Sequence, residues 1–196
     1  AHIIFSSVKL NINTHCIGIN SGCSGFVDAL IIAEKYINEY KCDTIIVTSD
    51  TYSKYINKKN FSIRPLFSDG SAATLIKYSK YGWKIKKKLT STKKNSNKFL
   101  TTIYNKNLNN YEIYMNGPEV LSFAISSVLP NLKSLIKENE QGVIFLHQAG
   151  KIVIDTIINK IGNNLIIPIN YPEKGNLISS SIPFLINENM KYLKKC

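Results

Sequence analysis

The sequence has no long hydrophobic run, and its start shows no signal-peptide pattern. Apolar runs such as residues 29–33 and 143–146 are far shorter than the roughly 18 residues that a membrane-spanning helix needs, so we expect a soluble chain. It begins at Ala1 without an initiator Met, and no charged segment precedes an apolar one. We therefore expect a piece of a longer protein. Its 196 residues, 44% of them hydrophobic, suffice for one ordinary globular core or two small ones.

Arginine is nearly absent. Only Arg64 among the 25 basic residues is an arginine, although 13 acidic residues leave a formal net charge of +12. Such a charge often indicates a nucleic acid, an anionic membrane or an acidic protein as partner. Dedicated nucleic-acid binders more often use arginine for bidentate contacts with bases and phosphates. We therefore expect neither a nucleic acid nor a membrane among the partners.

The four cysteines are Cys16, Cys23, Cys42 and Cys196, and they include no Cys-x-x-Cys pair. No histidine stands near them at metal-ligand spacing, so we expect no zinc site. A disulfide framework is also not expected in a chain of this length without a secretory signal, and a reducing cytoplasm fits best. Each cysteine is then either a buried apolar residue or a reactive thiol.

Hydrophobic periodicity divides the chain into alternating helices and strands. Apolar side chains recur at three- and four-residue spacing over residues 24–40 and 151–161, which predicts two helices. The β-branched run at residues 44–48 predicts a buried strand. Further predictions are strands at 71–78, 81–88, 143–146 and 165–169, a loop at 93–97 and a short helix at 180–185. Pro130 interrupts the helical pattern at 120–137, which predicts two helical pieces or one kinked helix there. The alternation predicts an α/β architecture with a mixed or largely parallel sheet.

Cys23 stands between two glycines, in Asn-Ser-Gly-Cys-Ser-Gly-Phe at residues 20–26, where the first helix is predicted to begin. Flanking glycines permit a tight turn and close approach of a substrate. A helix N-terminus favours a thiolate and an oxyanion, so we expect a lowered pKa of Cys23 and the greatest reactivity among the thiols. The alternative is a small residue packed at a crowded strand-to-helix turn.

His147 and Asn176 are the other two residues that attract interest. His147 follows a predicted strand and precedes a helix, a place where open α/β sheets bind ligands. Asn176 follows Gly175 and stands ahead of three serines. Taken singly, a strand-end histidine and a turn asparagine explain these two residues better. Together with Cys23 they supply a thiol, an imidazole and an amide on loops or element ends.

Five segments, in chain order, carry a family resemblance. Residues 22–26 (Gly-Cys-Ser-Gly-Phe) look like a nucleophile turn, residues 66–73 like an F-G-D-G-A-x-A segment, and residues 115–120 like an M-x-G-x-x-V helix entry. Residues 147–150 (His-Gln-Ala-Gly) are similar to an H-Q-A-N motif, and residues 175–183 to a G-N-T-S-S-A-S-I-P motif. The chain thereby resembles the β-ketoacyl-acyl-carrier-protein synthase III family.

The resemblance implies an α/β, thiolase-like fold of layered mixed sheets with buried helices, incomplete at both ends. Family members have a long segment before the nucleophile turn and end in a glycine-rich hairpin. Residues 1–100 would then be the end of the N-terminal half, which carries the nucleophile Cys23. Residues 101–196 would be the C-terminal half, which carries His147 and Asn176 but lacks the final hairpin.

The resemblance also implies a catalytic triad of Cys23, His147 and Asn176 in a condensing acyltransferase of fatty acid biosynthesis. Cys23 would take an acyl group from acyl-CoA. His147 and Asn176 would donate hydrogen bonds to the thioester oxygen of malonyl-acyl carrier protein while CO₂ leaves, and a 3-oxoacyl product would form. No cofactor and no metal would be needed. A cytoplasmic location and a homodimer of the complete protein are expected.

Two departures from the family pattern bear on binding and packing. The family's basic residue two positions after H-Q-A-N is Ile152 here, and Lys151 stands one position earlier, so Lys151 and Arg64 are candidates for substrate or carrier binding. Leu177 replaces a threonine after Asn176, which should alter packing more than chemistry. Two alternatives stay open, namely acyl transfer to an alcohol or amine by the same triad, and a non-catalytic remnant of a thiolase fold.

Overall fold

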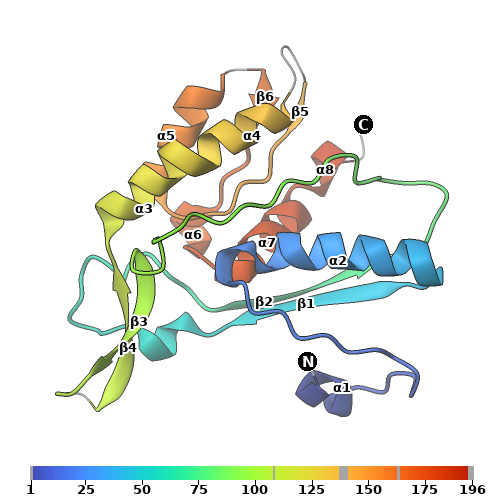
Figure 1. Ribbon diagram of the computed structural model, residues 1–196, viewed down its shortest axis with the longest axis horizontal. Helices are drawn as coiled ribbons and strands as arrows, with labels where there is room; N and C mark the ends of the chain where they lie inside the picture. Colours follow the sequence, from blue (N-terminus) through green and yellow to red (C-terminus); the bar gives the residue numbers. More distant parts are fainter. Residues whose placement is uncertain (1, 108, 137–140, 163, 194–196) are drawn as a thin grey trace.

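The computed structural model describes residues 2–107, 109–136, 141–162 and 164–193 (Figure 1). The earlier elements are α1 (His2–Ser7), the 3₁₀ turn η1 (Gly22–Ser24), α2 (Gly25–Tyr40), β1 (Thr44–Asp50), the 3₁₀ turn η2 (Tyr52–Tyr55), β2 (Gly70–Ile76), β3 (Leu100–Asn105) and β4 (Asn110–Met115). The later elements are α3 (Gly117–Phe123), the π-helical turn η3 (Ala124–Val128), α4 (Leu129–Leu135), β5 (Gly142–Val143), α5 (Lys151–Ile161), β6 (Leu165–Ile166), α6 (Tyr171–Lys174), the 3₁₀ turn η4 (Ile178–Ser180), α7 (Ser181–Glu188) and α8 (Met190–Leu193). None of the helices in this described part has the length and apolar character that crossing a membrane requires.

Helix α2 covers one face of the antiparallel pair β1–β2 (Figure 1). Phe26, Ala33 and Ile46 form a buried cluster between them, against which Ile182 and Ile186 of α7 also pack. Burying one such large apolar side chain contributes about 1.5–3 kcal/mol. The predicted helix at 24–40 and the predicted strands at 44–48 and 71–78 are therefore confirmed as elements. The first strand is not buried as predicted, because Ile45 and Val47 on its second face are exposed. The buried face of α2 is shorter than predicted, because Tyr40, the last residue of this helix, is 66% exposed.

Strands β3 and β4 form an antiparallel hairpin that the sequence pattern did not predict. Within these two strands, Ile113 of β4 is the one fully buried residue. Buried and exposed side chains therefore do not alternate regularly along them, and the sequence shows no clear strand pattern. Conversely, the strand predicted at residues 81–88 is wrong. These residues are exposed and have no regular secondary structure, whereas the predicted loop at 93–97 is confirmed.

Helices α3, α4 and α5 pack together beside a short parallel pair, β5–β6. The side chain of Asn116 caps α3 by accepting a hydrogen bond from the backbone N–H of Glu119. Pro130 stands in the first turn of α4, directly after the π-helical turn, so the predicted interruption is confirmed. The strands predicted at 143–146 and 165–169 are regular over only two residues each.

The described strands make three two-stranded sheets, two antiparallel and one parallel. The predicted mixed pairing is confirmed, but a largely parallel sheet is wrong. The order of strands and helices is that of an α/β protein, as predicted. The division into units at residues 1–100 and 101–196 stays a prediction.

Segments far apart in the sequence meet where residues 66–68 run beside Asn176. Phe67 and Asn176 form a parallel β-bridge. The backbone N–H of Ser68 donates to the carbonyl of Asn176 at 3.0 Å, and the N–H of Asn176 donates to the carbonyl of Leu66 at 2.8 Å. The approach to β2 is thereby joined to the approach to α7, and the loops of interest lie around this junction.

Candidate active site

Cys23 lies in η1, immediately before α2, and its side chain is partly buried. Gly22 adopts a φ of +51°, which glycine reaches without the steric cost of a side chain. The thiol packs against a cluster that includes Phe67 and Ile178. Burial first, and then the negative charge of Asp50, raise the pKa of Cys23 to about 11, while a backbone hydrogen bond lowers it by less. The lowered pKa expected from the helix N-terminus is therefore wrong in this structure, because loss of water outweighs the helix end.

His147 lies between β5 and α5, and its ring is almost fully buried. Neither Nδ1 nor Nε2 has a hydrogen-bond partner among the described residues. Burial lowers the pKa of His147 to about 4, so the ring is neutral at neutral pH and carries one N–H. It can therefore donate one hydrogen bond and accept another from a bound molecule.

Asn176 lies between α6 and η4, with its side chain 4% exposed. Its Oδ1 accepts a hydrogen bond from the backbone N–H of Ile178 at 2.9 Å, which supports the unusual φ of +53° at that β-branched residue. Gly175 has a φ of +68°, and a Cβ there would lie 2.5 Å from Oγ of Ser68. No hydrogen bond among the described residues uses Nδ2 of Asn176, so this amide group keeps a donor for a ligand.

The three residues surround one segment, residues 66–68. Cys23 packs against the buried cluster that contains Phe67, and Phe67 is bridged to Asn176. The loop of His147 reaches the same segment through Gly150, where a Cβ would lie 2.6 Å from Cδ1 of Leu66. No hydrogen bond in the described ranges joins the three side chains to one another. They are held as neighbours of a common segment.

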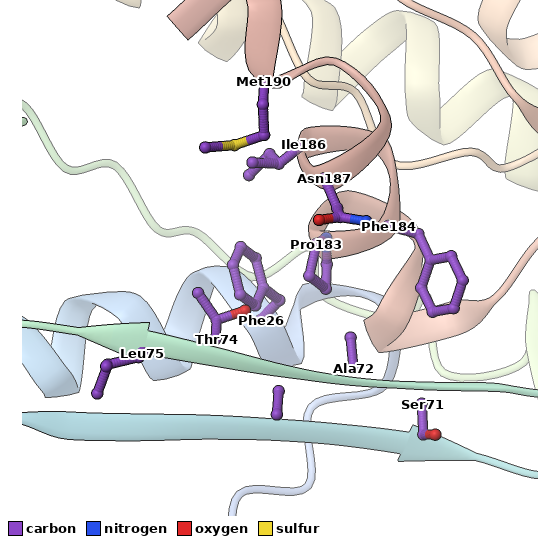
Figure 2. Close-up of a pocket in the computed structure, with 11 residues that line it drawn as sticks. Phe26, Ser71, Ala72, Thr74, Leu75, Pro183, Phe184, Ile186, Asn187 and Met190 are labelled. Atoms are coloured by element: carbon purple, nitrogen blue, oxygen red, sulfur yellow. The ribbon is translucent and has the colours of Figure 1, made fainter. Parts of the chain in front are cut away.

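A pocket of about 440 Å³ lies elsewhere, between β2 and the α7–α8 region (Figure 2). Phe26, Thr74, Pro183 and Met190 are among its lining residues. None of Cys23, His147 and Asn176 lines it. The pocket therefore does not belong to the candidate site.

Comparison with known proteins finds similarity to one family of enzymes. Residues 17–93 match the family model of 3-Oxoacyl-[acyl-carrier-protein (ACP)] synthase III. The chain is 30% identical over 182 residues to a β-ketoacyl-[acyl-carrier-protein] synthase III of Enterococcus faecalis, covering 87% of this chain and 56% of the relative. Over these residues the chain is similar to the synthase III family. A synthase III of Streptococcus pneumoniae is 29% identical over 184 residues, covering 87% of this chain and 57% of the relative.

Solved synthase III structures share the fold. A crystal structure of 3-oxoacyl-(acyl-carrier-protein) synthase III matches with a TM-score of 0.83 at 24% identity, covering 97% of this chain and 65% of that one. The synthase III of Aquifex aeolicus matches with a TM-score of 0.77 at 24% identity, covering 92% of this chain and 59% of that one. The predicted thiolase-like α/β fold is thereby confirmed. The chain spans a little over half the length of the curated synthase III relatives it matches.

The departures from the synthase III motifs can now be located. Lys151 begins α5 and is exposed, and its Nζ lies 2.7 Å from Oδ2 of Asp155. The hydrogen bond to Asp155, and then the negative charge of Asp155, raise the pKa of Lys151. Arg64 is exposed as well, and binding roles for Lys151 and Arg64 stay predictions. Leu177 packs closely against Gly70, since a Cβ at Gly70 would lie 3.0 Å from Cδ2 of Leu177. This agrees with the expected effect on packing.

Sequence reasoning missed three residues near Cys23. Asp50 accepts hydrogen bonds from the backbone N–H and the hydroxyl of Ser179, and its charge acts on Cys23. Tyr52 packs its ring on Phe67 at 5.4 Å, and its pKa is raised by burial and then by Cys23. The one signal for Asp50 is its place at the carboxyl end of a β-branched strand. Nothing in the local pattern indicates Tyr52 or Ser179.

The described residues offer no donor set for a metal ion. Among them, no group of three or more His, Cys, Asp or Glu side chains is placed to hold one. Cys16, Cys23 and Cys42 are free thiols. Cys196 lies outside the described residues.

Proposed function

We propose that this protein is a 3-oxoacyl-[acyl-carrier-protein] synthase III-type condensing enzyme, which joins an acyl thioester to malonyl-acyl carrier protein through an acyl-Cys23 intermediate. The observation that carries the proposal is the state of His147. A buried, neutral imidazole with two unpartnered nitrogens is costly unless a ligand uses it. The similarity to synthase III proteins supports the same chemistry.

The first step transfers an acyl group to Cys23. The sulfur attacks the carbonyl carbon of acyl-CoA, the bond from that carbon to the CoA sulfur breaks, and the thiol proton ends on the departing CoA. The apolar neighbours of Cys23, including Ile63, Phe67 and Ile178, suit an acyl chain better than a charged group. The raised pKa of Cys23 implies that the resting thiol is protonated and that proton removal accompanies the attack.

The second step is the decarboxylation of a malonyl thioester. The bond to the carboxylate breaks, CO₂ leaves, and the electron pair forms an enolate whose oxygen needs hydrogen-bond donors. His147 and Nδ2 of Asn176 are neutral donors with no protein acceptor among the described residues, so they are assigned to this oxygen. The enolate carbon then attacks acyl-Cys23, the carbon–sulfur bond breaks, and the Cys23 thiolate is released and reprotonated.

Acyl-CoA and malonyl-acyl carrier protein are the proposed substrates and partners. An acidic carrier would be attracted by the basic surface. Exposed Lys84, Lys86, Lys87 and Arg64 are its candidate contacts, whereas Lys88 is already paired with Glu34. A homodimer, a cytoplasmic location and the absence of a cofactor stay part of the proposal.

The proposal is tested on the natural gene product in two measured steps. Labelled acyl-CoA should place its acyl group on Cys23, found by mass spectrometry, and a Cys23→Ser variant should not be labelled. Added malonyl-acyl carrier protein should then release CO₂ and yield a 3-oxoacyl thioester. His147→Ala and Asn176→Ala should each slow CO₂ release about 100- to 1000-fold while acyl loading changes little.

Two other outcomes select the alternatives. Acyl-Cys23 that forms, releases no CO₂ and passes its acyl group to an alcohol or amine would establish simple acyl transfer. A folded protein that forms no acyl-Cys23 would be a non-catalytic member of the family. Variants that load acyl groups slowly yet decarboxylate normally would overturn the roles given to His147 and Asn176.

A further inference from the structure

The side chain of Gln148, next to His147, is fully buried and uses its amide at both ends. Its Nε2 donates to the carbonyl of Leu146 at 2.9 Å. Its Oε1 accepts from the backbone N–H of Asn170 at 3.0 Å and from that of Tyr171 at 3.2 Å. One side chain thus joins the residue before His147 to the start of α6.

Helix α6 carries this connection on to Asn176. The backbone carbonyl of Asn170 accepts from Lys174 at 2.9 Å, and Tyr171 accepts from Gly175 at 3.0 Å, which closes a single helical turn. Asn176 follows directly, and its own backbone is fixed on Leu66. A hydrogen-bonded turn therefore connects the acceptor atom of Gln148 with the residue before Asn176.

A second contact fixes the same corner of the molecule. Nδ2 of Asn170 donates to Oε2 of Glu188 at 2.7 Å, at the end of α7. The ring of His147, by contrast, makes no hydrogen bond to any residue in the described part of the chain. Its placement must come from packing and from the backbone on either side, which Gln148 holds.

We propose that Gln148 is a positioning residue whose side-chain amide sets the relative placement of His147 and Asn176. The inference rests on the proposed function, in which these two residues donate to one enolate oxygen. A donor pair works only when both hydrogens point at the same atom, and a misplacement of about 1 Å can cost on the order of 100-fold in rate.

The main variant is Gln148→Met, which keeps a similar volume and removes the three hydrogen bonds. In the natural gene product, CO₂ release from malonyl-acyl carrier protein should fall about 10- to 100-fold, while loading of Cys23 changes less than about threefold. The matched control is Gln141→Met, at an exposed glutamine directly before β5, and it should change neither step. Because both steps are measured on one sample, a lower folded fraction would reduce them equally.

Gln148→Glu provides a rescue test. A charged Glu accepts both N–H groups but cannot donate to Leu146, whereas a protonated Glu restores one donor and one acceptor. Burial and the nearby carboxylate of Glu188, itself 3.9 Å from Nζ of Lys174, should raise the pKa of the new side chain. CO₂ release by this variant should therefore recover as pH falls, relative to the natural protein at the same pH.

A readout that needs no activity separates failure of this inference from failure of the proposed function. The ring signals of His147 and the side-chain amide signals of Asn176 should move in NMR spectra of Gln148→Met and stay in place in Gln141→Met. Unmoved signals, or an unchanged ratio of CO₂ release to Cys23 loading, would overturn the positioning role. A natural protein that releases no CO₂ would overturn the proposed function, and the NMR comparison would still decide the role of Gln148.

Discussion

The carboxylate of Asp50 accepts two hydrogen bonds from Ser179, one from its backbone N–H at 3.1 Å and one from its hydroxyl. The two residues are separated by 129 positions in the sequence. The contact ties the carboxyl end of β1 to the turn that leads into α7. It also holds a negative charge close to Cys23, where it contributes to the raised pKa of the thiol.

Replacing Asp50 with Asn should make Cys23 more reactive. The carboxamide oxygen can still accept from Ser179, but the charge that disfavours the thiolate is gone. Alkylation of Cys23 at pH 8 should therefore speed up, by less than about tenfold, because burial is the larger cause of the raised pKa. Asp43→Asn, which removes a carboxylate near the opposite end of β1, should leave the rate unchanged. Equal rates in both variants would contradict the charge effect.

Limited alkylation of the natural protein should modify Cys42 before Cys23. Cys42 is exposed, whereas Cys23 is partly buried with a pKa raised to about 11, so little thiolate is present at neutral pH. The rate at Cys23 should climb as pH rises toward that value. Peptide mapping by mass spectrometry across pH 7 to about 10 measures both rates. Preferential labelling of Cys23 at pH 7 would instead restore the activated thiol expected from its place at a helix N-terminus.

His147 should make the protein sensitive to mild acid. Its pKa is lowered in the folded state from 6.5 to about 4, so the unfolded chain binds more protons between these values and stability falls as pH decreases through them. The loss should approach about 3 kcal/mol near pH 4. Urea unfolding at several pH values measures it. His147→Gln should flatten this dependence, whereas His15→Gln, at an exposed position, should preserve it.

Gly150→Ala should destabilise the fold by about 2 kcal/mol. Gly150 has a φ of +119°, and its Cβ would stand 2.6 Å from Cδ1 of Leu66, so an alanine is both strained and crowded. Gly117→Ala is the control, because Gly117 starts α3 with open space around it. Urea midpoints compare the two variants. Adding Leu66→Ala to Gly150→Ala should relieve the crowding but leave the backbone strain in place. Full recovery of stability in this double variant would contradict a contribution from backbone strain.

The sequence alone was enough for the features that depend on local pattern. Periodicity located the long helices α2 and α5, because their buried faces follow the helical repeat. The turn and strand patterns placed Cys23, His147 and Asn176 beside the elements where the structure has them. The family motifs predicted the thiolase-like fold. The catalytic roles of the three residues stay predictions.

The tertiary structure decided the features that depend on distant neighbours. Packing buries Cys23 and raises its pKa, which a helix N-terminus alone would lower. The meeting of residues 66–68 with Asn176, and of Asp50 with Ser179, joins segments more than a hundred residues apart. Burial and hydrogen bonding across such separations depend on how helices and strands pack together, and local sequence carries no direct record of that packing.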